Sequence, residues 1–227
     1  MEAVTENWDL YFRGFGYTLF LFLVAGLASM LLGTFLAACR VGPIAVLSKA
    51  TAVYVTVVRN TPLVIVFAFF AFAAPLFGIH FRWLDVHIGD YDFTSFYGAA
   101  VVSLTLYTSV FVCEALRSGV NAVPLGQAEA ARAIGLPFAG VMSNVILPQA
   151  FRASVPPLAS VQIALIKNTS VAAVFGMAEA TATMRGLNNN YSAGVPLFIA
   201  FAIGYIVLVE LFSFGAFRLE RHWRIAR

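Results

Sequence analysis

The chain has 227 residues, of which 61% are hydrophobic and only 11% are charged, and its formal net charge is +3. Ordinary globular domains are about 45–50% apolar and about 25% charged, so this composition excludes a soluble globular protein. The chain is too short and too apolar to carry a separate soluble domain, and we expect one membrane domain over residues 1–227. Cys39 and Cys113 lie in or beside apolar runs and indicate buried thiols, not a disulfide framework.

Five apolar segments are long enough to cross a bilayer, which takes about 20 residues within a range of about 17–25. Each must be a helix, because lipid offers no partner to a free backbone amide. The predicted fold class is therefore an all-α integral membrane protein with five transmembrane helices. In chain order the predicted spans cover residues 17–38, 58–77, 96–113, 155–175 and 195–217.

The first span ends in Leu36-Ala-Ala-Cys39, which looks like a lipoprotein processing site. A signal peptide, however, has a basic N-terminal region and an apolar core of about 7–15 residues. Here the N-terminal region is acidic and the apolar run is far longer, so we expect a span and no cleaved signal peptide.

The distribution of Lys and Arg predicts which helix ends face the cytoplasm. With the N-terminus outside, the basic residues divide ten inside to three outside, and Lys167 remains within a span. We therefore expect the N-terminus outside and the C-terminus in the cytoplasm. The inner residues are Arg40, Lys49, Arg59, Arg117, Arg132, Arg152, Arg218, Arg221, Arg224 and Arg227, and the outer ones are Arg13, Arg82 and Arg185.

The loop between the third and fourth spans, about residues 118–152, would then be cytoplasmic. Residues 127–134 are rich in good helix formers, Gly135 fits a helix C-cap, and Pro137 fits the first turn of a following helix. A second helix over residues 138–146, stopped near Pro148, would complete a helix–turn–helix.

The first of these two helices carries Glu129 among alanines at positions 128, 130 and 131. We expect these alanines to keep that face shallow, so that a partner can approach and Glu129 can meet a basic group on it. The alternative is an Ala/Glu surface helix that contacts nothing.

The spacing of this loop is similar to that of a known motif. Glu129-Ala130-Ala131, then Gly135, Val145, Leu147 and Pro148, resembles the cytoplasmic EAA loop of permease subunits of bacterial ATP-binding-cassette importers. That loop has Glu-Ala-Ala, three residues, Gly, nine residues, an aliphatic residue, any residue and Leu-Pro. Val145 stands where the family usually has Ile.

The resemblance extends over nearly the whole chain. Arg59-Asn-Thr-Pro-Leu63, Glu114-Ala-Leu-Arg-Ser-Gly-Val120 and Lys167-Asn-Thr-Ser170, with Gly176 and Glu179, look like the polar amino-acid permeases of the histidine, glutamine and glutamate group. The run from Ser118 to Arg132 is similar to that of actinobacterial glutamate-uptake permeases.

The resemblance implies a MetI-like permease of the bacterial cell membrane that forms half of a translocation pathway for a polar amino acid, with glutamate favoured. It implies a cytoplasmic ATPase dimer as partner, which binds ATP and Mg, and no cofactor on this chain. It also implies a second permease subunit, a paralogue in preference to an identical copy, and an extracytoplasmic amino-acid-binding protein. The implied ATPase-coupling residues are Glu129, Ala130, Ala131, Gly135, Leu147 and Pro148.

Two rival functions are less well supported by the residues. A stand-alone secondary transporter driven by an ion gradient would need no ATPase, and uptake by the purified chain alone would support it, but it does not explain the Glu129–Pro148 pattern. The chain has no G-x-x-x-x-G-K-[ST] loop of its own, which is consistent with an ATPase on another chain. An intramembrane enzyme is disfavoured because H-E-x-x-H, G-x-S-x-G and a membrane-embedded Asp pair are all absent from the sequence. We therefore expect a transport subunit that is not itself an enzyme.

Polar residues within the spans are candidates for the substrate pathway. Lys167 costs about 2.5–3.5 kcal/mol at a span centre, and with Asn168, Thr169 and Ser170 it could meet a substrate carboxylate. Alternatively, Lys167 could extend to the outer interface or pair with a helix carbonyl.

In the third span Thr108 and Ser109, with Tyr107, could line the same cavity or simply bond across helices.

Three charged residues near the inner side are predicted to be structural or gate-supporting. Glu114 and Arg117 are three residues apart, which permits an ion pair on one helix, and Arg59 would cap the second span.

The two ends of the membrane domain carry further charge. The outer loop has His80, Asp85, His87, Asp90 and Asp92. A metal site is conceivable there, but the spacing of these residues matches no strong ligand pattern. We therefore expect this loop to hold no metal and to contact the binding protein. The basic tail, Arg218, Arg221, Arg224 and Arg227, suits anionic lipid headgroups and is too short for nucleic acid.

Overall fold

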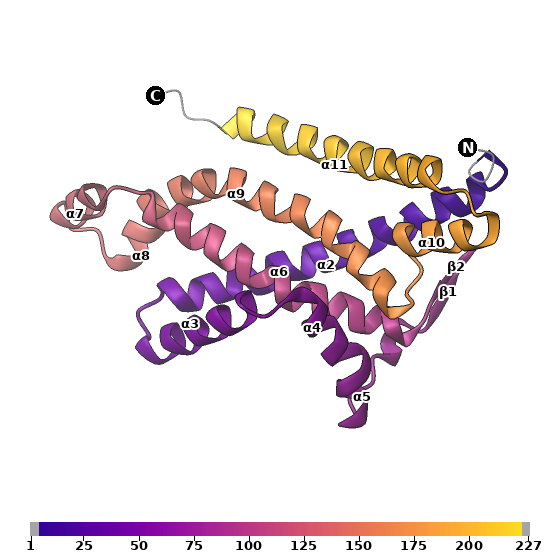
Figure 1. Ribbon diagram of the computed structural model, residues 1–227. Coiled ribbons are helices and arrows are strands. Elements are labelled where there is room, and N and C mark those ends of the chain that lie inside the picture. The colour runs from indigo at the N-terminus through magenta and orange to yellow at the C-terminus, as the bar shows by residue number, and fades with distance from the viewer. Residues whose placement is uncertain (1–4, 224–227) are drawn as a thin grey trace.

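The computed structural model describes residues 5–223 and is a bundle of long helices (Figure 1). The helices α2, α6, α9 and α11 lie along one another; α7 and α8 project at one end, and α10 and the β1–β2 hairpin lie at the other. The elements are α2 (Trp8–Val41), α3 (Ala45–Arg59), α4 (Leu63–Ala68), the π-helix η1 (Phe69–Ala73), α5 (Ala74–Leu76), the 3-10 helix η2 (Arg82–Leu84), β1 (Val86–Ile88), β2 (Tyr91–Phe93), α6 (Ser95–Asn121), α7 (Leu125–Ala133), α8 (Phe138–Val141), the π-helix η3 (Met142–Ile146), α9 (Leu147–Asn168), the 3-10 helix η4 (Thr169–Phe175), α10 (Ala180–Tyr191) and α11 (Val195–Trp223).

The all-α membrane fold is confirmed. Within residues 5–223, four helical stretches are long and apolar enough to cross a bilayer by themselves: Trp8–Val41, Ser95–Asn121, Phe138–Phe175 and Val195–Arg221. A fifth span exists only if the two helices 45–59 and 63–76, which bend by 99°, are counted together.

The second predicted span, residues 58–77, is therefore not one straight helix. The side chains of Asn60 and Thr61 donate hydrogen bonds back to the carbonyls of Thr56 and Val57 and end α3. Pro62 follows with extended backbone (ψ 136°), and it has no N–H to continue the helix. Hydropathy alone does not register this break, because the residues on both sides of it are apolar.

Pro148 does not stop the helix before it, contrary to expectation. The chain turns through the π-helix η3 and continues into α9 with Pro148 in its first turn. A proline is tolerated there because the first amides of a helix have no intrahelical partner. The helix then runs to Asn168, narrows to the 3-10 helix η4 and ends at Gly176, whose φ is +75°.

The core lies where α2 packs against α6 and α9, and two glycines permit the close approach. A Cβ on Gly33 would lie 2.5 Å from Cβ of Val112, and one on Gly119 would lie 1.9 Å from Oγ of Ser154. The bundle is tightest around α6, where 61% of the residues in the most apolar stretch are buried. In the corresponding stretch of α11 only 11% are buried. The helix α11 is therefore peripheral.

Candidate functional site

The predicted helix–turn–helix exists as α7 and α8. The amide of Gly135 (φ +88°) donates to the carbonyl of Arg132 and that of Leu136 to Ala131, which closes the end of α7. Pro137 then precedes α8. Gly135 is required here because its backbone lies in the left-handed region, which costs other residues free energy.

Glu129 is exposed on the outer face of α7, but the alanines around it are divided between two faces. Ala130 is exposed beside it, whereas Ala128 and Ala131 are 9% and 5% exposed and pack against Val141 of α8. The expectation that all three alanines form a shallow outer face was therefore wrong for two of them. Small residues at these positions instead let α8 lie close to α7.

Two large apolar side chains are exposed at the two ends of α7, one at its first residue and one at its C-cap. Leu125 is 81% exposed and Ile134 is 80% exposed, on either side of Glu129. Exposed apolar residues that flank a charge are typical of a docking surface. Neither residue was predicted, although both lie at the ends of the Ala-rich stretch in the sequence.

A hydrogen bond ties α7 to the long helix α9. The side-chain amide of Gln149 donates to Oε1 of Gln127 and to the carbonyl of Val145, so α7 is braced against the start of α9. Leu147 and Pro148, the last two residues of the predicted motif, are exposed at the start of α9. They lie at the base of the projecting loop and not on the Glu129 face.

A pocket of about 300 Å³ lies between α6 and α9, and its mainly apolar lining includes several polar side chains. It brings together Tyr107, Thr108 and Asn168 from the predicted pathway residues. Ser160 joins them, one α9 turn from Ala164 and two from Asn168, a spacing that could have identified it. The hydroxyl of Thr108 is buried and has no hydrogen-bond partner among the described residues.

The other predicted pathway residues do not line this pocket. Ser109 is buried and donates to the carbonyl of Leu106, and Thr169 is buried and donates to Ile166. Lys167 is exposed, and its carbonyl accepts a hydrogen bond from Ser170.

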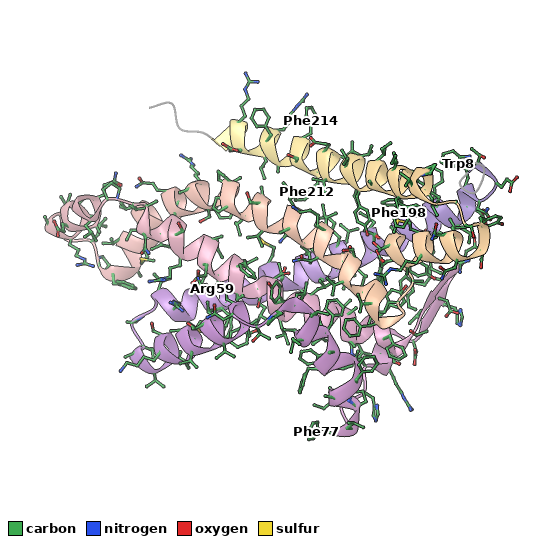
Figure 2. The ribbon with its side chains drawn as sticks, in the orientation of Figure 1. Trp8, Arg59, Phe77, Phe198, Phe212 and Phe214 are labelled. Carbon is green, nitrogen blue, oxygen red and sulfur yellow. The ribbon has the colours of Figure 1, made fainter. Side chains whose placement is uncertain are left out.

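Glu114 pairs with Arg59, not with Arg117. Its Oε2 lies 2.6 Å from Nη1 of Arg59, at the end of α3 (Figure 2), and both side chains are partly exposed. The prediction of a Glu114–Arg117 pair within one helix was wrong because α3 brings a competing cation to the same carboxylate. The two helices are thereby joined at the point where α3 ends.

A second polar cluster surrounds Glu179, which is fully buried at the start of α10. Its carboxylate accepts hydrogen bonds from the amide of Ala182 at 2.8 Å and the hydroxyl of Tyr205 at 2.7 Å. Burial raises the pKa of this carboxyl, and these hydrogen bonds oppose the rise.

The residues on either side of Glu179 are also held. The amide of Ala180 donates to Thr18, and the hydroxyl of Tyr97 donates to the carbonyl of Ala178. Residues 178–180 thus connect α2, α6 and α11 at the end of the bundle opposite α7. In the sequence, Glu179 stood out only through the family resemblance and its position between two apolar segments.

Within residues 5–223 no group of three or more His, Cys, Asp or Glu side chains is placed to hold a metal ion. In the outer loop His87 and Asp92 face each other across the β hairpin at 3.2 Å. Of the basic tail, Arg218 lies over the ring of Phe214, whereas Arg224 and Arg227 lie outside the described residues.

Comparison with known proteins adds to this geometry. A family model described as the inner membrane component of binding-protein-dependent transport systems matches residues 15–225. The chain is 38% identical to the glutamate transport system permease protein GluC of Corynebacterium efficiens, over 94% of this chain and 93% of that protein. It is 31% identical to the probable glutamine ABC transporter permease protein GlnM of Bacillus subtilis, over 97% and 96%.

Solved structures are similar as well. The structure of an amino acid ABC transporter with histidines superposes with a TM-score of 0.85 at 27% identity and covers 97% of both chains. An inward-facing structure of the MetNI methionine ABC transporter gives a TM-score of 0.74 at 22% identity, over 95% of this chain and 97% of that one.

Proposed function

Because the chain belongs to the family of inner membrane components of binding-protein-dependent transport systems, we propose that it is the permease subunit of an ATP-driven glutamate importer. The family is a permease component of the bacterial inner membrane and not itself an ATPase. Glutamate is the proposed substrate because the relatives at 38% and 35% identity are glutamate permeases, and glutamine is the nearest competitor. A secondary transporter or an intramembrane enzyme would not account for the family match.

The observation that carries this proposal is the outer face of α7. Glu129 lies exposed between Leu125 and Ile134 on a short helix that projects from the end of the bundle. A carboxylate between two apolar side chains fits a groove on an ATPase with one basic group and two apolar pockets, because charge fixes the orientation and apolar burial adds affinity. The hydrogen bond from Gln149 of α9 to Gln127 of α7 would transmit movement of that ATPase to the pathway helices.

The proposed orientation places α7 in the cytoplasm and the N-terminus outside, supported by the excess of Lys and Arg on the α7 side. ATP and Mg would be bound by the ATPase dimer. A second permease subunit, a paralogue in preference to a copy, would complete the pathway, with the pocket of Thr108, Ser160 and Asn168 on its wall. The β1–β2 hairpin end would meet the amino-acid-binding protein.

The test is Glu129→Lys in the full transporter, assayed in proteoliposomes for substrate-stimulated ATP hydrolysis and glutamate uptake. We expect both to fall at least tenfold while the permease still inserts, because the charge now repels the basic group of the ATPase groove. Ala139→Lys is the control, because it introduces the same lysine side chain at an exposed position on α8 and leaves Glu129 in place. Normal coupled transport by Glu129→Lys would rule out the coupling role.

A further inference from the structure

The fourth span ends in a 3-10 helix of unusual length. The helix α9 continues at Asn168 directly into η4, which keeps 3-10 geometry over the seven residues Thr169–Phe175. Runs of 3-10 helix longer than three or four residues are uncommon, because their hydrogen-bond geometry is poorer than that of an α-helix. The segment η4 is therefore a candidate for a change of helix type.

The chain beyond η4 is held in place at the end of the bundle where α10 lies (Figure 1). Residues 178–180 make hydrogen bonds with the side chains of Tyr97 on α6, Thr18 on α2 and Tyr205 on α11. Three long helices thus fix the chain just after η4, and we call residues 178–180 the anchor.

The opposite end of α9 is joined to the helix that is proposed to meet the ATPase. The side-chain amide of Gln149, near the start of α9, donates a hydrogen bond to Gln127 of α7. When the ATPase moves α7, as the proposed function requires, α9 moves with it while the anchor stays in place. The distance between α9 and the anchor must then change, and η4 is the helical segment that lies between them.

A change of helix type in η4 would supply this difference in length. A 3-10 helix rises about 2.0 Å per residue and an α-helix about 1.5 Å, so conversion of seven residues shortens the segment by about 3.5 Å. The accompanying rotation, about 20° per residue, can be taken up at Gly176, which follows η4 with a φ of +75° and has open space around it. Asn168 would approach the anchor and shift relative to Thr108 across their shared pocket.

The side chains of η4 suit both helix types. The buried residues Thr169, Ala172 and Ala173 have the i, i+3, i+4 spacing of an α-helix face. Phe175 instead continues the three-residue spacing from Thr169 and Ala172, and its ring stacks on Phe67 of α4 with 5.5 Å between the ring centres. The stacking favours the 3-10 form, whereas the two alanines are small enough to face the core in either form.

Two hydroxyl groups hold the start of η4 in its present form. Thr169 donates to the carbonyl of Ile166, and Ser170 donates to the carbonyl of Lys167, each at 2.7 Å. In a continued α-helix these carbonyls would accept hydrogen bonds from the amides four residues on. Ser and Thr side chains offer such carbonyls another partner and thereby compete with the α-helical pattern.

We propose that residues 169–175 alternate between the 3-10 helix of this structure and an α-helix during transport, so that α9 shifts by about 3.5 Å relative to the anchor and reshapes the pocket of Thr108 and Asn168. This inference rests on the proposed function, because the ATPase supplies the movement. The alternative is a rigid shift of α9, in which η4 keeps its helix type and only the chain around Gly176 deforms. The two differ in the spacing of side chains within η4.

The first measurement is the distance between α9 and α10 in the full transporter, assembled with its ATPase and second permease subunit in nanodiscs. Spin labels are attached at Ala153→Cys and Asn189→Cys, both exposed, in a chain whose own thiols are removed by Cys39→Ala and Cys113→Ala. We expect electron–electron double resonance to show distances that differ by about 3 Å with and without ATP, because η4 has a different length in the two conditions.

The second measurement reports the helix type itself. Ser170→Cys combined with Val174→Cys puts two thiols four residues apart, which are neighbours in an α-helix but point a third of a turn apart in a 3-10 helix. Cd²⁺ should therefore bridge them and protect them from a maleimide reagent in only one of the two ATP conditions. Val171→Cys combined with Val174→Cys is the control, because residues three apart are neighbours in both helix types and should be protected in both conditions.

The inference is overturned if the label distance is the same with and without ATP. It is also overturned if the pair at positions 170 and 174 responds to Cd²⁺ alike in both conditions, since the shift of α9 would then be rigid. Either result in a transporter that takes up glutamate normally leaves the proposed function standing. Absence of ATP-dependent uptake by the unmodified transporter would overturn the proposed function and this inference with it.

Discussion

Arg59 and Glu114 are 55 positions apart in the chain, and their side chains form an ion pair of 2.6 Å at the point where α3 ends. The pair holds that end of α3 against α6 just before the chain bends by 99° into α4. Its partners are 47% and 32% exposed, so solvent screens the charges and we expect a modest contribution, about 0.2–1 kcal/mol.

A double-mutant cycle tests this pair. Arg59→Gln and Glu114→Gln should each lower the unfolding temperature slightly, and the double variant should cost no more than the larger single change. Arg117→Gln is the control, because Arg117 forms no ion pair among the described residues. A loss from Arg117→Gln equal to that from Arg59→Gln, measured by thermal unfolding in detergent, would contradict the assignment.

Gly119→Ala should separate α6 from α9. A Cβ there would lie 1.9 Å from Oγ of Ser154 and 2.5 Å from the carbonyl oxygen of Ala150, and the second contact is with backbone, which cannot move aside. We expect a loss of about 1–3 kcal/mol in the free energy of unfolding. Gly215→Ala should cost nothing, since it enters open space and improves helix propensity. Equal stability of the two variants would show that α6 and α9 are not in close contact at Gly119.

Glu179→Gln should alter how stability depends on pH. Because burial raises the pKa of this carboxyl above its ordinary value of 4.5, the folded chain holds the proton more tightly than the unfolded chain. That stabilisation is fully present below about pH 4.5 and is lost as the pH rises through the folded pKa. The glutamine variant should therefore gain stability relative to wild type as the pH rises above about 4.5, as measured by unfolding temperature.

Asp90→Asn, which changes an exposed carboxyl of the β hairpin, is the control for Glu179→Gln and should show no such trend. A stability difference between Glu179→Gln and wild type that is the same at every pH would mean that Glu179 titrates alike in the folded and unfolded chains.

Thr108→Val separates a structural from a transport role for the pocket between α6 and α9. The Thr108 hydroxyl is buried without a partner, so replacing it by a methyl group of similar shape should leave stability unchanged or slightly raised. If the hydroxyl contacts substrate, the KM for glutamate uptake should rise several-fold. Ser109→Ala is the comparison, because the Ser109 hydroxyl already bonds to Leu106 and should not affect KM. An unchanged KM for Thr108→Val would remove Thr108 from the pathway.

Much of the fold could be predicted because hydropathy reports directly on membrane burial. The long apolar segments, the family and the α7–α8 turn at Gly135 all follow from local composition and spacing. The bend at Asn60–Pro62 could not be read in this way, because apolar residues on both sides hide a change of direction that side-chain capping and one proline produce.

The sites were harder to predict because their residues come from different helices. Sequence spacing paired Glu114 with Arg117, but the true partner comes from another helix. The surroundings of Glu179 depend on which helix faces meet, and one-dimensional periodicity does not specify that. The predicted helix–turn–helix around Glu129, whose residues are close in the chain, is present as α7 and α8, and its coupling role stays a prediction.

The bend between α3 and α4 has a consequence for how the chain enters the bilayer. The segment Leu63–Leu76 beyond the bend has fourteen residues, about 21 Å of helix, which is too short to cross a hydrocarbon core of roughly 30 Å. During synthesis this segment cannot be recognised as an autonomous membrane span. We expect it to stay at the translocation channel until α6 emerges, so that the two insert as one hairpin.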